Sequence, residues 1–244
     1  MRRREQGEPT SSNGASSFHA HWELPAGSPT EFVEAAATIE VLDRPQVDRL
    51  YFWALQVSFV DRGRRHGGAH VGLQWHHSHP GSTAVNWGGY GADGVELTGS
   101  ESVLSSATNN ANTRSMDWSP GLRYRLRVGP GEPGWWPASI TDLDSGTEVP
   151  IRALHADGRA LAHPVVWSEV FARCEHPSVR VRWSDLTAVT AGGDEVRPAA
   201  AHLTYQEVAN GGCSNTDTSW DGTGVVQTTA TPRLHTNRLE LPEI

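Results

Sequence analysis

Residues 51–90, YFWALQVSFVDRGRRHGGAHVGLQWHHSHPGSTAVNWGGY, decide the fold class of this chain. Residues 51–60 are rich in aromatic and β-branched side chains, and the polar, Gly-rich segment 61–68 follows them. Residues 69–75 then alternate small or polar residues with apolar ones, which is the pattern of a half-buried strand. The stretch therefore predicts consecutive antiparallel strands that carry aromatic, amide and imidazole side chains.

The remaining sequence repeats this pattern of short strands and turns. Residues 122–128 alternate almost perfectly between apolar positions and basic or aromatic ones, so one face of that strand should lie in a core. The Gly- and Asn-rich segment 88–114 is interpreted mostly as loop. Further strands are expected at 37–41, 134–142, 147–154, 165–174, 179–189, 202–208 and 224–231. The sequence predicts an all-β fold, a two-sheet antiparallel β-sandwich.

Length and composition limit the organisation of the chain. Its 244 residues suit one large β-sandwich domain, which we expect over residues 31–244 with a loop region at its C-terminal end. Residues 1–30 are expected to be disordered or irregular, because the first 17 are polar and contain few apolar side chains.

The charge balance and hydropathy exclude two classes of partner. The net charge of −8 argues against a nucleic-acid surface, which needs clustered basic charge. No stretch is long and apolar enough to span a membrane, so no membrane partner is expected. The first residues lack the apolar segment of a signal peptide, so the expectation is a cytoplasmic protein, or a secreted one if the N-terminus is incomplete. The composition specifies no oligomeric state.

Two cysteines, Cys174 and Cys213, lie near expected strand ends. One long-range disulfide between them would suit an exported protein. Two unpaired thiols in a reducing compartment are the alternative, because pairing depends on spatial proximity.

The order of the elements resembles that of the concanavalin A-like lectin/glucanase sandwiches, and in particular a group of poorly characterised bacterial domains. The resemblance covers residues 31–230. It rests on the aromatic strand at 51–60, the segment from Gly68 to Gln74, and four later features: Val85-Asn86-Trp87, the Tyr124 strand, the Trp136, Asp142 and Gly146 hairpin, and Trp167-Ser168-Glu169. It implies a concanavalin-like jelly roll and a carbohydrate ligand. The glucanase members carry a Glu-x-Asp-x-x-Glu catalytic strand, and this sequence has none.

Aromatic and amide side chains near the expected strand ends are the candidate ligand-binding residues. Indole faces stack on the apolar faces of sugars, and amides can both donate to and accept from hydroxyls. Most tryptophans of a sandwich fill its core, which is the alternative for each of them. The predicted glycan-binding surface consists of Gln74, Trp75, Asn86, Trp87, Tyr90 and Trp135.

Metal sites have weaker signals, and no resident metal is predicted. The histidines of His76-His77-Ser78-His79 could coordinate a metal, but surface histidines are the preferred interpretation. Two acidic loops offer calcium-type oxygen ligands, although the first is also ordinary turn chemistry. The candidate calcium ligands are Asp142, Asp144 and Glu148 in one loop and Asp217 and Asp221 in the other.

For catalysis, Glu169 is the best candidate, because an otherwise apolar strand around it would raise its pKa. Glu207 is its candidate partner, since glycoside hydrolysis uses two carboxylates. Pairing of Glu169 with an arginine such as Arg180 or Arg182 is the structural alternative. The leading hypothesis is a carbohydrate-binding, lectin-like protein with a glycan or polysaccharide partner. The alternatives are a glycoside hydrolase or lyase and a non-catalytic protein-interaction module, and fold alone does not decide among them.

Overall fold

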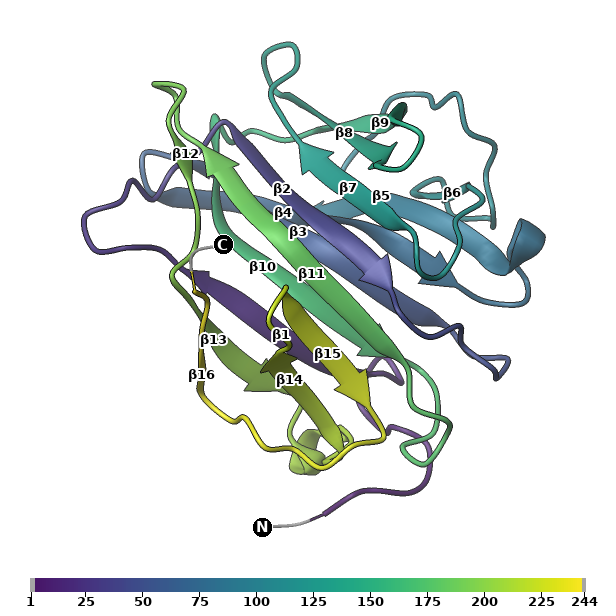
Figure 1. Cartoon of the computed structure of the whole chain (residues 1–244). Coiled ribbons are helices and arrows are strands. Elements are labelled where there is room, and N and C mark those ends of the chain that lie inside the picture. Colours follow the sequence, from purple (N-terminus) through teal and green to yellow (C-terminus); the bar gives the residue numbers. More distant parts are fainter. Residues whose placement is uncertain (1–2, 243–244) are drawn as a thin grey trace.

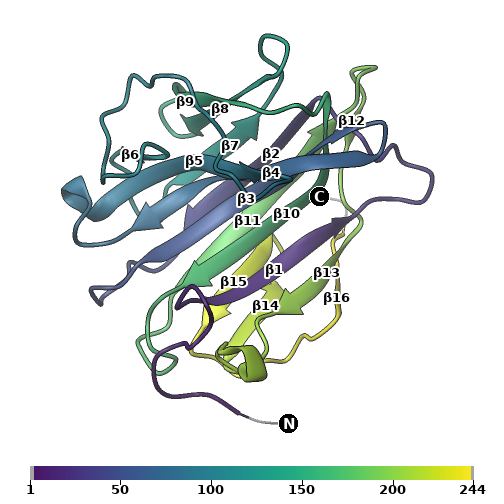
Figure 2. The same ribbon diagram turned by 180° about the vertical axis from the view of Figure 1, so that it is seen from behind.

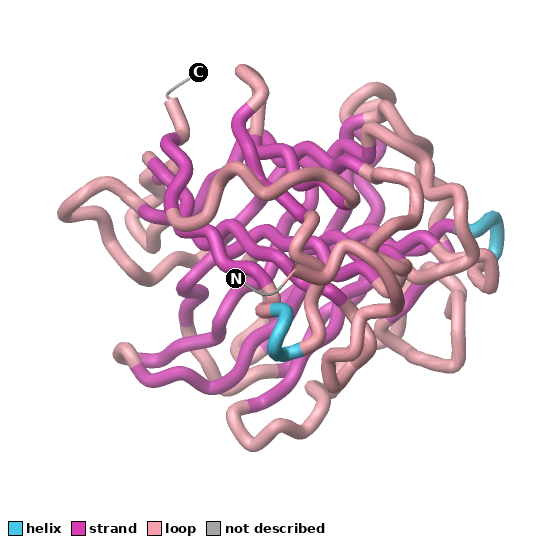
Figure 3. Tube along the Cα trace, turned by 90° about the horizontal axis from the view of Figure 1, so that it is seen from below, coloured by secondary structure: helices cyan, strands magenta, loops and turns pink. Residues whose placement is uncertain are grey.

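The computed structural model describes residues 3–242, and these form two antiparallel β-sheets packed face to face (Figure 1). The sequence-based prediction of an all-β, two-sheet sandwich is confirmed. Only two short 3-10 turns interrupt the described strands, at Pro80–Ser82 and Val208–Asn210 (Figure 3). No helix of the described residues is long and apolar enough to cross a membrane.

The first sheet, called sheet A, has the order β16-β13-β1-β10-β3-β4-β5-β6. Its strands in chain order are β1 (Ser16–Glu23), β3 (Tyr51–Asp61), β4 (Arg64–Trp75), β5 (Thr83–Gly91), β6 (Thr113–Ser115), β10 (Ala160–Val170), β13 (Ala200–Tyr205) and β16 (Arg238–Glu240). Every neighbouring pair is antiparallel, and β3 with β4 forms the long hairpin that the sequence predicts.

The second sheet, called sheet B, has the order β14-β15-β11-β2-β7-β8-β9, and β12 pairs with β11 beside this path. Its strands are β2 (Glu34–Val41), β7 (Arg123–Val128), β8 (Trp135–Asp142), β9 (Thr147–His155), β11 (Arg180–Val189), β12 (Glu195–Val196), β14 (Thr216–Trp220) and β15 (Val225–Thr229).

The core lies between the sheets and follows the alternation of the strands. In β3, Tyr51, Trp53, Leu55 and the other odd-numbered residues through Phe59 point to sheet B and are almost fully buried. Because successive side chains of a strand point to opposite faces, the even-numbered residues of β3 point to the outer face of sheet A. Burying the apolar face of each sheet is the main source of the sandwich's stability.

A buried polar network connects the sheets inside this core. Gln227 of β15 is almost fully buried, and its Oε1 accepts hydrogen bonds from Ser168 Oγ (2.8 Å) and Trp183 Nε1 (3.1 Å). Its Nε2 donates to the carbonyl oxygen of Phe18 at 3.0 Å. One amide therefore forms hydrogen bonds with groups from both sheets. Buried polar groups need such partners, because they have lost their hydrogen bonds to water.

The N-terminal region differs from the sequence-based expectation of a disordered or irregular segment at residues 1–30. Residues 16–23 form β1, which lies between β10 and β13 within sheet A. Phe18, Ala20 and Trp22 point to the core, and the polar residues between them point outward. The physical reason is this period-2 alternation, which buries enough apolar surface to order the segment.

Candidate functional site

An open groove lies on the outer face of sheet A, the face turned away from sheet B. Figure 2 shows the strands of this face in front. The volume of the groove is about 810 Å³, and it crosses β1, β10, β3, β4 and β5. Five strands spaced about 4.8 Å apart give a length of about 19 Å, which matches an extended ligand of about six residues. The groove lining includes the side chains of Asn13, Ser17, His19, Gln56, Arg65, His70, Tyr90, Trp167 and Glu169.

An aromatic cluster forms the middle of the groove floor. The ring of Trp167 lies 4.9 Å from that of Phe52 and 5.5 Å from that of His70, with edge-to-face geometry in both pairs. Trp167 pairs with Ala54 across the strands, and Ala54 pairs with Gly72. A Cβ at Gly72 would lie 2.7 Å from the Cβ of Ala54, so the small residues leave the outer face to the indole. The cluster is separate from the main core.

Glu169 of β10 occupies one end of the groove. Its Oε1 accepts a hydrogen bond from Asn13 Nδ2 at 2.6 Å and a long one from Ser17 Oγ at 3.4 Å. Burial raises the pKa of Glu169, and these two hydrogen bonds oppose the rise. Neither Arg180 nor Arg182 pairs with it, since these side chains bind Asp43, Glu40 and Asp221. A half-buried carboxyl with a raised pKa is suited to general acid–base chemistry.

Gln56 of β3 lies on the same face as Glu169. Its Oε1 accepts a hydrogen bond from Trp167 Nε1 at 3.2 Å, so its amide NH2 group is directed away from the indole. Gln56 pairs with Val165, four residues before Glu169, which places the two about 13 Å apart along the strand. Trp167, which pairs with Ala54, lies between them on the same face.

Two neutral histidines complete the middle of the groove. Burial lowers the pKa of His70 to about 4, and burial with the nearby His21 lowers the pKa of His19 to about 4. Both imidazoles are therefore uncharged at neutral and mildly acidic pH. They can donate or accept one hydrogen bond each without adding charge to the groove.

The opposite end of the groove is more exposed and carries a positive charge. Arg65 of β4 is exposed, and its Nε donates to the carbonyl oxygen of Gly67 at 3.2 Å. Tyr90 of β5 is 55% exposed and lies beside it. The groove therefore has a carboxyl at one end and a guanidinium and phenol at the other.

The structure separates the six residues of the predicted glycan-binding surface. Trp75 and Trp87 point into the core and are 3% and 0% exposed, so the expectation that they offer a face to solvent needs correction. Both indoles lie on the side of β4 and β5 that faces the core, together with Val71, Leu73 and Val85. Of the six, Tyr90 alone lines the groove.

The other three members of that set also lie away from the groove. Gln74 and Asn86 are buried on β4 and β5, and Asn86 Nδ2 donates to Thr113 Oγ1 at 3.0 Å. Trp135 belongs to sheet B, where its ring contacts His155 at 5.2 Å. The proposed row of exposed aromatics with adjacent amides is therefore not one surface.

The two candidate catalytic carboxylates, Glu169 and Glu207, lie in different pockets. Glu207 lines a different pocket, with Tyr205 and Arg233, so it does not face Glu169 across the groove. The expected two-carboxylate arrangement is therefore wrong.

The disulfide prediction is confirmed, since Cys174 and Cys213 are bonded with a Cα–Cα distance of 5.5 Å.

The carboxylates of the two candidate calcium loops bind the protein's own groups. Asp142 Oδ1 accepts the backbone N–H groups of Asp144 and Ser145, and Glu148 accepts from Ser139 Oγ. Within residues 3–242, no group of three or more His, Cys, Asp or Glu side chains has a geometry that could hold a metal ion.

The second of these loops shows the same use of its carboxylates. Asp217 accepts hydrogen bonds from the backbone N–H groups of Leu234 and His235, and Asp221 pairs with Arg182.

In the histidine cluster His76-His77-Ser78-His79, His77 Nδ1 lies 2.9 Å from Asp48 Oδ1, and His79 is buried.

Sequence reasoning missed most of the groove residues. Ser17 and His19 were missed because β1 was not recognised, although SFHAHW alternates with period 2. Gln56 and His70 lie in predicted strands, and the even-numbered, outward side of ALQVSF and of GAHVGL was the available signal. Asn13 had no signal in the local pattern.

Comparison with known proteins identifies no relative by sequence. No family model and no curated protein matches the chain. Among solved structures, scytalido-glutamic peptidase with a transition-state analogue and SCP-B, an eqolisin peptidase in complex with the tripeptide Ala-Ile-His, each have 13% identity and a TM-score of 0.47. Each match covers 90% of this chain and 99% of the other. Peanut lectin with a nine-residue peptide has 12% identity and a TM-score of 0.25, covering 66% and 74%.

The coarser part of the resemblance stated above, a jelly-roll-like β-sandwich, agrees with the two-sheet architecture. The finer part, a place among the lectin and glucanase sandwiches, is not shown.

Proposed function

We propose that the groove on sheet A binds an extended polymer and that Glu169 catalyses hydrolysis of one of its bonds, a peptide bond being the best fit. The observation that carries this proposal is that one half-buried carboxyl and the NH2 group of Gln56 line the same groove. A carboxyl and an amide donor supply the two functions that amide hydrolysis needs, proton transfer and stabilisation of an oxyanion.

The same lining argues against the glycosidase alternative. Both common mechanisms of glycoside hydrolysis use two carboxyl groups on opposite sides of the scissile bond. Among the described residues that line the groove, Glu169 is the one carboxylate, and Glu207 lies in another pocket. A peptide bond has no such requirement for a second carboxylate.

The proposed reaction uses Glu169 first as a base and then as an acid. The Glu169 carboxylate takes a proton from a water molecule, whose oxygen forms a bond to the carbonyl carbon of the substrate. The NH2 group of Gln56 donates a hydrogen bond to the resulting oxyanion. The C–N bond then breaks, the leaving nitrogen takes the proton from Glu169, and the carboxylate is restored.

The electrostatics of the groove favour mildly acidic conditions. The raised pKa of Glu169 brings its proton exchange closer to neutral pH. His19 and His70, whose pKa values are about 4, stay neutral there and leave the charge of Glu169 uncompensated. We expect the rate to fall at low pH, where Glu169 is protonated and cannot act as the base.

The test is hydrolysis of denatured proteins and of a peptide library between pH 3 and 8, with products identified by mass spectrometry. Glu169→Gln keeps an acceptor for Asn13 but cannot exchange a proton, so it should lower the rate at least 100-fold. Glu207→Gln is the matched control and should leave the rate unchanged. Equal rates for wild type and Glu169→Gln, or no cleavage of any peptide, would reject the proposal.

Carbohydrate binding without catalysis is the second candidate. It is supported by the exposed ring of Tyr90 and by the lining residues Trp167 and His70, which can contact apolar sugar faces. A glycan array tests it, with Tyr90→Ala as the variant that should weaken binding and Trp135→Ala, outside the groove, as its control. Absence of binding to every glycan would remove this candidate.

A further inference from the structure

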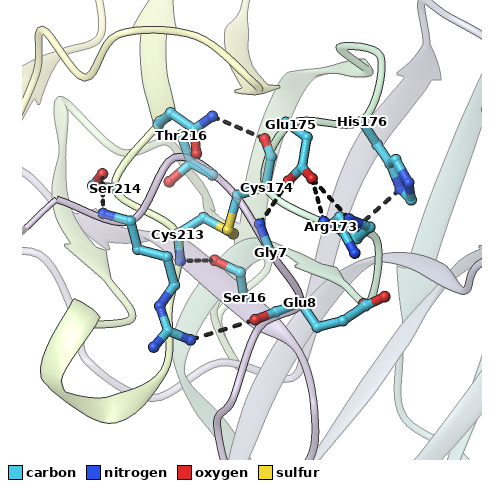
Figure 4. Close-up of a disulfide and its surroundings, with 12 residues drawn as sticks. Gly7, Glu8, Ser16, Arg173, Cys174, Glu175, His176, Cys213, Ser214 and Thr216 are labelled. Atoms are coloured by element: carbon cyan, nitrogen blue, oxygen red, sulfur yellow. Dashed lines mark hydrogen bonds and ion pairs between the residues drawn. A yellow bond between two sulfur atoms is a disulfide. The ribbon is translucent and has the colours of Figure 1, made fainter.

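The segment before β1, residues 4–15, forms a strap along loops that the disulfide connects (Figure 4). The backbone N–H of Cys174 donates to the carbonyl oxygen of Gly7 at 3.0 Å, and the N–H of Gly7 donates to Glu175 Oε2 at 2.7 Å. The strap therefore pairs with the loop of the first half-cystine.

The same strap also pairs with the loop of the second half-cystine. Arg4 N–H donates to Ser214 Oγ at 2.9 Å, and Ser214 N–H donates to the Arg4 carbonyl oxygen at 2.8 Å. Further along, the N–H of Thr10 donates to the carbonyl oxygen of Gly211 at 3.0 Å. Two loops joined by one covalent bond thus hold the strap at both sides.

The last part of the strap contacts the groove. Asn13 Oδ1 accepts a hydrogen bond from the backbone N–H of Ala15 (3.2 Å), and Ser11 Oγ, which donates to the Ala15 carbonyl oxygen at 2.5 Å, lies 2.8 Å from this Oδ1. These contacts fix the amide orientation, so that Nδ2 donates to Glu169 Oε1 at 2.6 Å. Of the two contacts that the Glu169 carboxyl accepts, this one is much the shorter.

We propose that Asn13 is a positioning residue for Glu169, and that the Cys174–Cys213 disulfide acts on the groove by holding the strap that carries Asn13. This assignment rests on the proposed function only for its effect on catalysis. The hydrogen bond leaves Glu169 Oε2 to face the ligand and favours the ionised carboxylate, because a donor to a carboxylate stabilises the charged form.

Few other groups can influence the charge of Glu169. On the groove face, β1 contributes His19, and β4 contributes His70 and, at the far end, Arg65. Neighbouring β3 contributes Phe52 and Gln56, which do not titrate. Both histidines stay neutral above pH 5 and the arginine stays charged, so replacement of Asn13 acts on the carboxyl directly.

The decisive experiment is direct titration of the Glu169 carboxyl by carbon-detected NMR in the full chain, with Glu169→Gln identifying its signal. Asn13→Ser keeps an oxygen that can serve the turn but does not reach Glu169, and should raise the pKa of Glu169 by about one pH unit. Asn13→Asp keeps the turn but places a second carboxylate beside Glu169, and should raise it further. Exposed Asn109→Ser is the control and should leave it unchanged.

Activity profiles provide the second readout. If peptides are cleaved, the acidic limb of the kcat/KM profile should move to higher pH by the same amount in Asn13→Ser, an effect that a loss of stability alone does not produce. A Glu169 titration identical in wild type and both Asn13 variants would overturn the assignment, even if peptides are cleaved. A shifted titration with no cleavage would retain Asn13 as a positioning residue and reject the proposed function.

The disulfide is tested with the double variant Cys174→Ala, Cys213→Ala. We expect faster hydrogen exchange at Gly7 and Thr10 and a Glu169 titration that approaches that of Asn13→Ser. A folded double variant with wild-type exchange and titration would show that the disulfide does not hold the strap. If the double variant does not fold, the same exchange measurement on folded wild-type protein after reduction of the Cys174–Cys213 bond decides this part with the same two outcomes.

Discussion

Acidification should destabilise the fold through His19 and His70, because both must be uncharged in the folded groove. Their pKa values fall to about 4 from 6.5, so the unfolded chain binds protons more tightly than the folded one. Their contribution to stability is complete above pH 6.5, decreases as the pH falls from 6.5 to 4, and does not change below that. The fold should therefore lose stability in this window.

The magnitude follows from the two shifts. Between pH 7.5 and 4.5, a shift of this size is worth about 2.5 kcal/mol per histidine as an upper figure. The groove is open to solvent, so we halve this value to about 1 kcal/mol each. Glu169 has the opposite effect on stability. Burial of its ionised carboxylate opposes folding and raises its pKa, so its protonation at low pH stabilises the folded state.

Guanidinium unfolding followed by tryptophan fluorescence measures the effect at several pH values between 7.5 and 4.5. His70→Asn replaces the imidazole by a side chain that does not titrate, and should lose about 1 kcal/mol less than wild type across this range. His163→Asn is the control, since His163 is exposed on β10. Parallel stability curves for wild type and His70→Asn would refute the reasoning that the groove holds this imidazole neutral.

Three further outcomes test the fold and the corrected aromatic assignments. Gln227→Leu leaves polar groups of both sheets without partners and should lower the free energy of unfolding by about 3 kcal/mol; a loss below 1 kcal/mol in chemical denaturation contradicts this. Removal of the Cys174–Cys213 bond, which closes a loop with a sequence separation of 39, should cost about 4 kcal/mol, and an unchanged melting temperature would disprove it. Trp87→Phe should lower the melting temperature without changing ligand affinity, whereas Tyr90→Ala should do the reverse; the opposite pattern would restore Trp87 as a binding residue.

Much of the fold could be predicted from the sequence, because strand alternation is a local property. The hairpin of β3 and β4, the alternation of β7 and the hairpin of β8 and β9 were visible as period-2 patterns. The expected pairing of 165–174 with 179–189 is wrong, because β10 lies in sheet A and β11 lies in sheet B. β1 was missed for a physical reason: it follows a polar segment, and its alternation covers only six residues, SFHAHW. Its place in the middle of sheet A depends on pairing with β10 and β13, distant in sequence.

The candidate site was harder to predict, because it depends on which face of each strand lies outside. Alternation shows that Trp87 and Asn86 point to opposite faces, but it does not show which face is the core. The indoles were therefore assigned to the surface, and the structure places Trp75 and Trp87 inside. Glu169 was found because its charge is unusual in an apolar strand, while its partner Asn13 comes from a segment 156 residues away.

The two outer faces of the sandwich explain why we propose the groove, and not the opposite side, as the place for a ligand. On the outer face of sheet B, long side chains already neutralise each other, as in the pairs Arg127–Glu34 and Arg182–Glu40. A ligand there would have to replace partners that these charged side chains already have. On the outer face of sheet A, no cationic side chain of residues 3–242 pairs with Glu169, and the NH2 group of Gln56 lies in the groove. A ligand that supplies hydrogen-bonding groups to the outer face of sheet A makes contacts that the protein itself does not make. On the outer face of sheet B, the charged groups are already paired with each other.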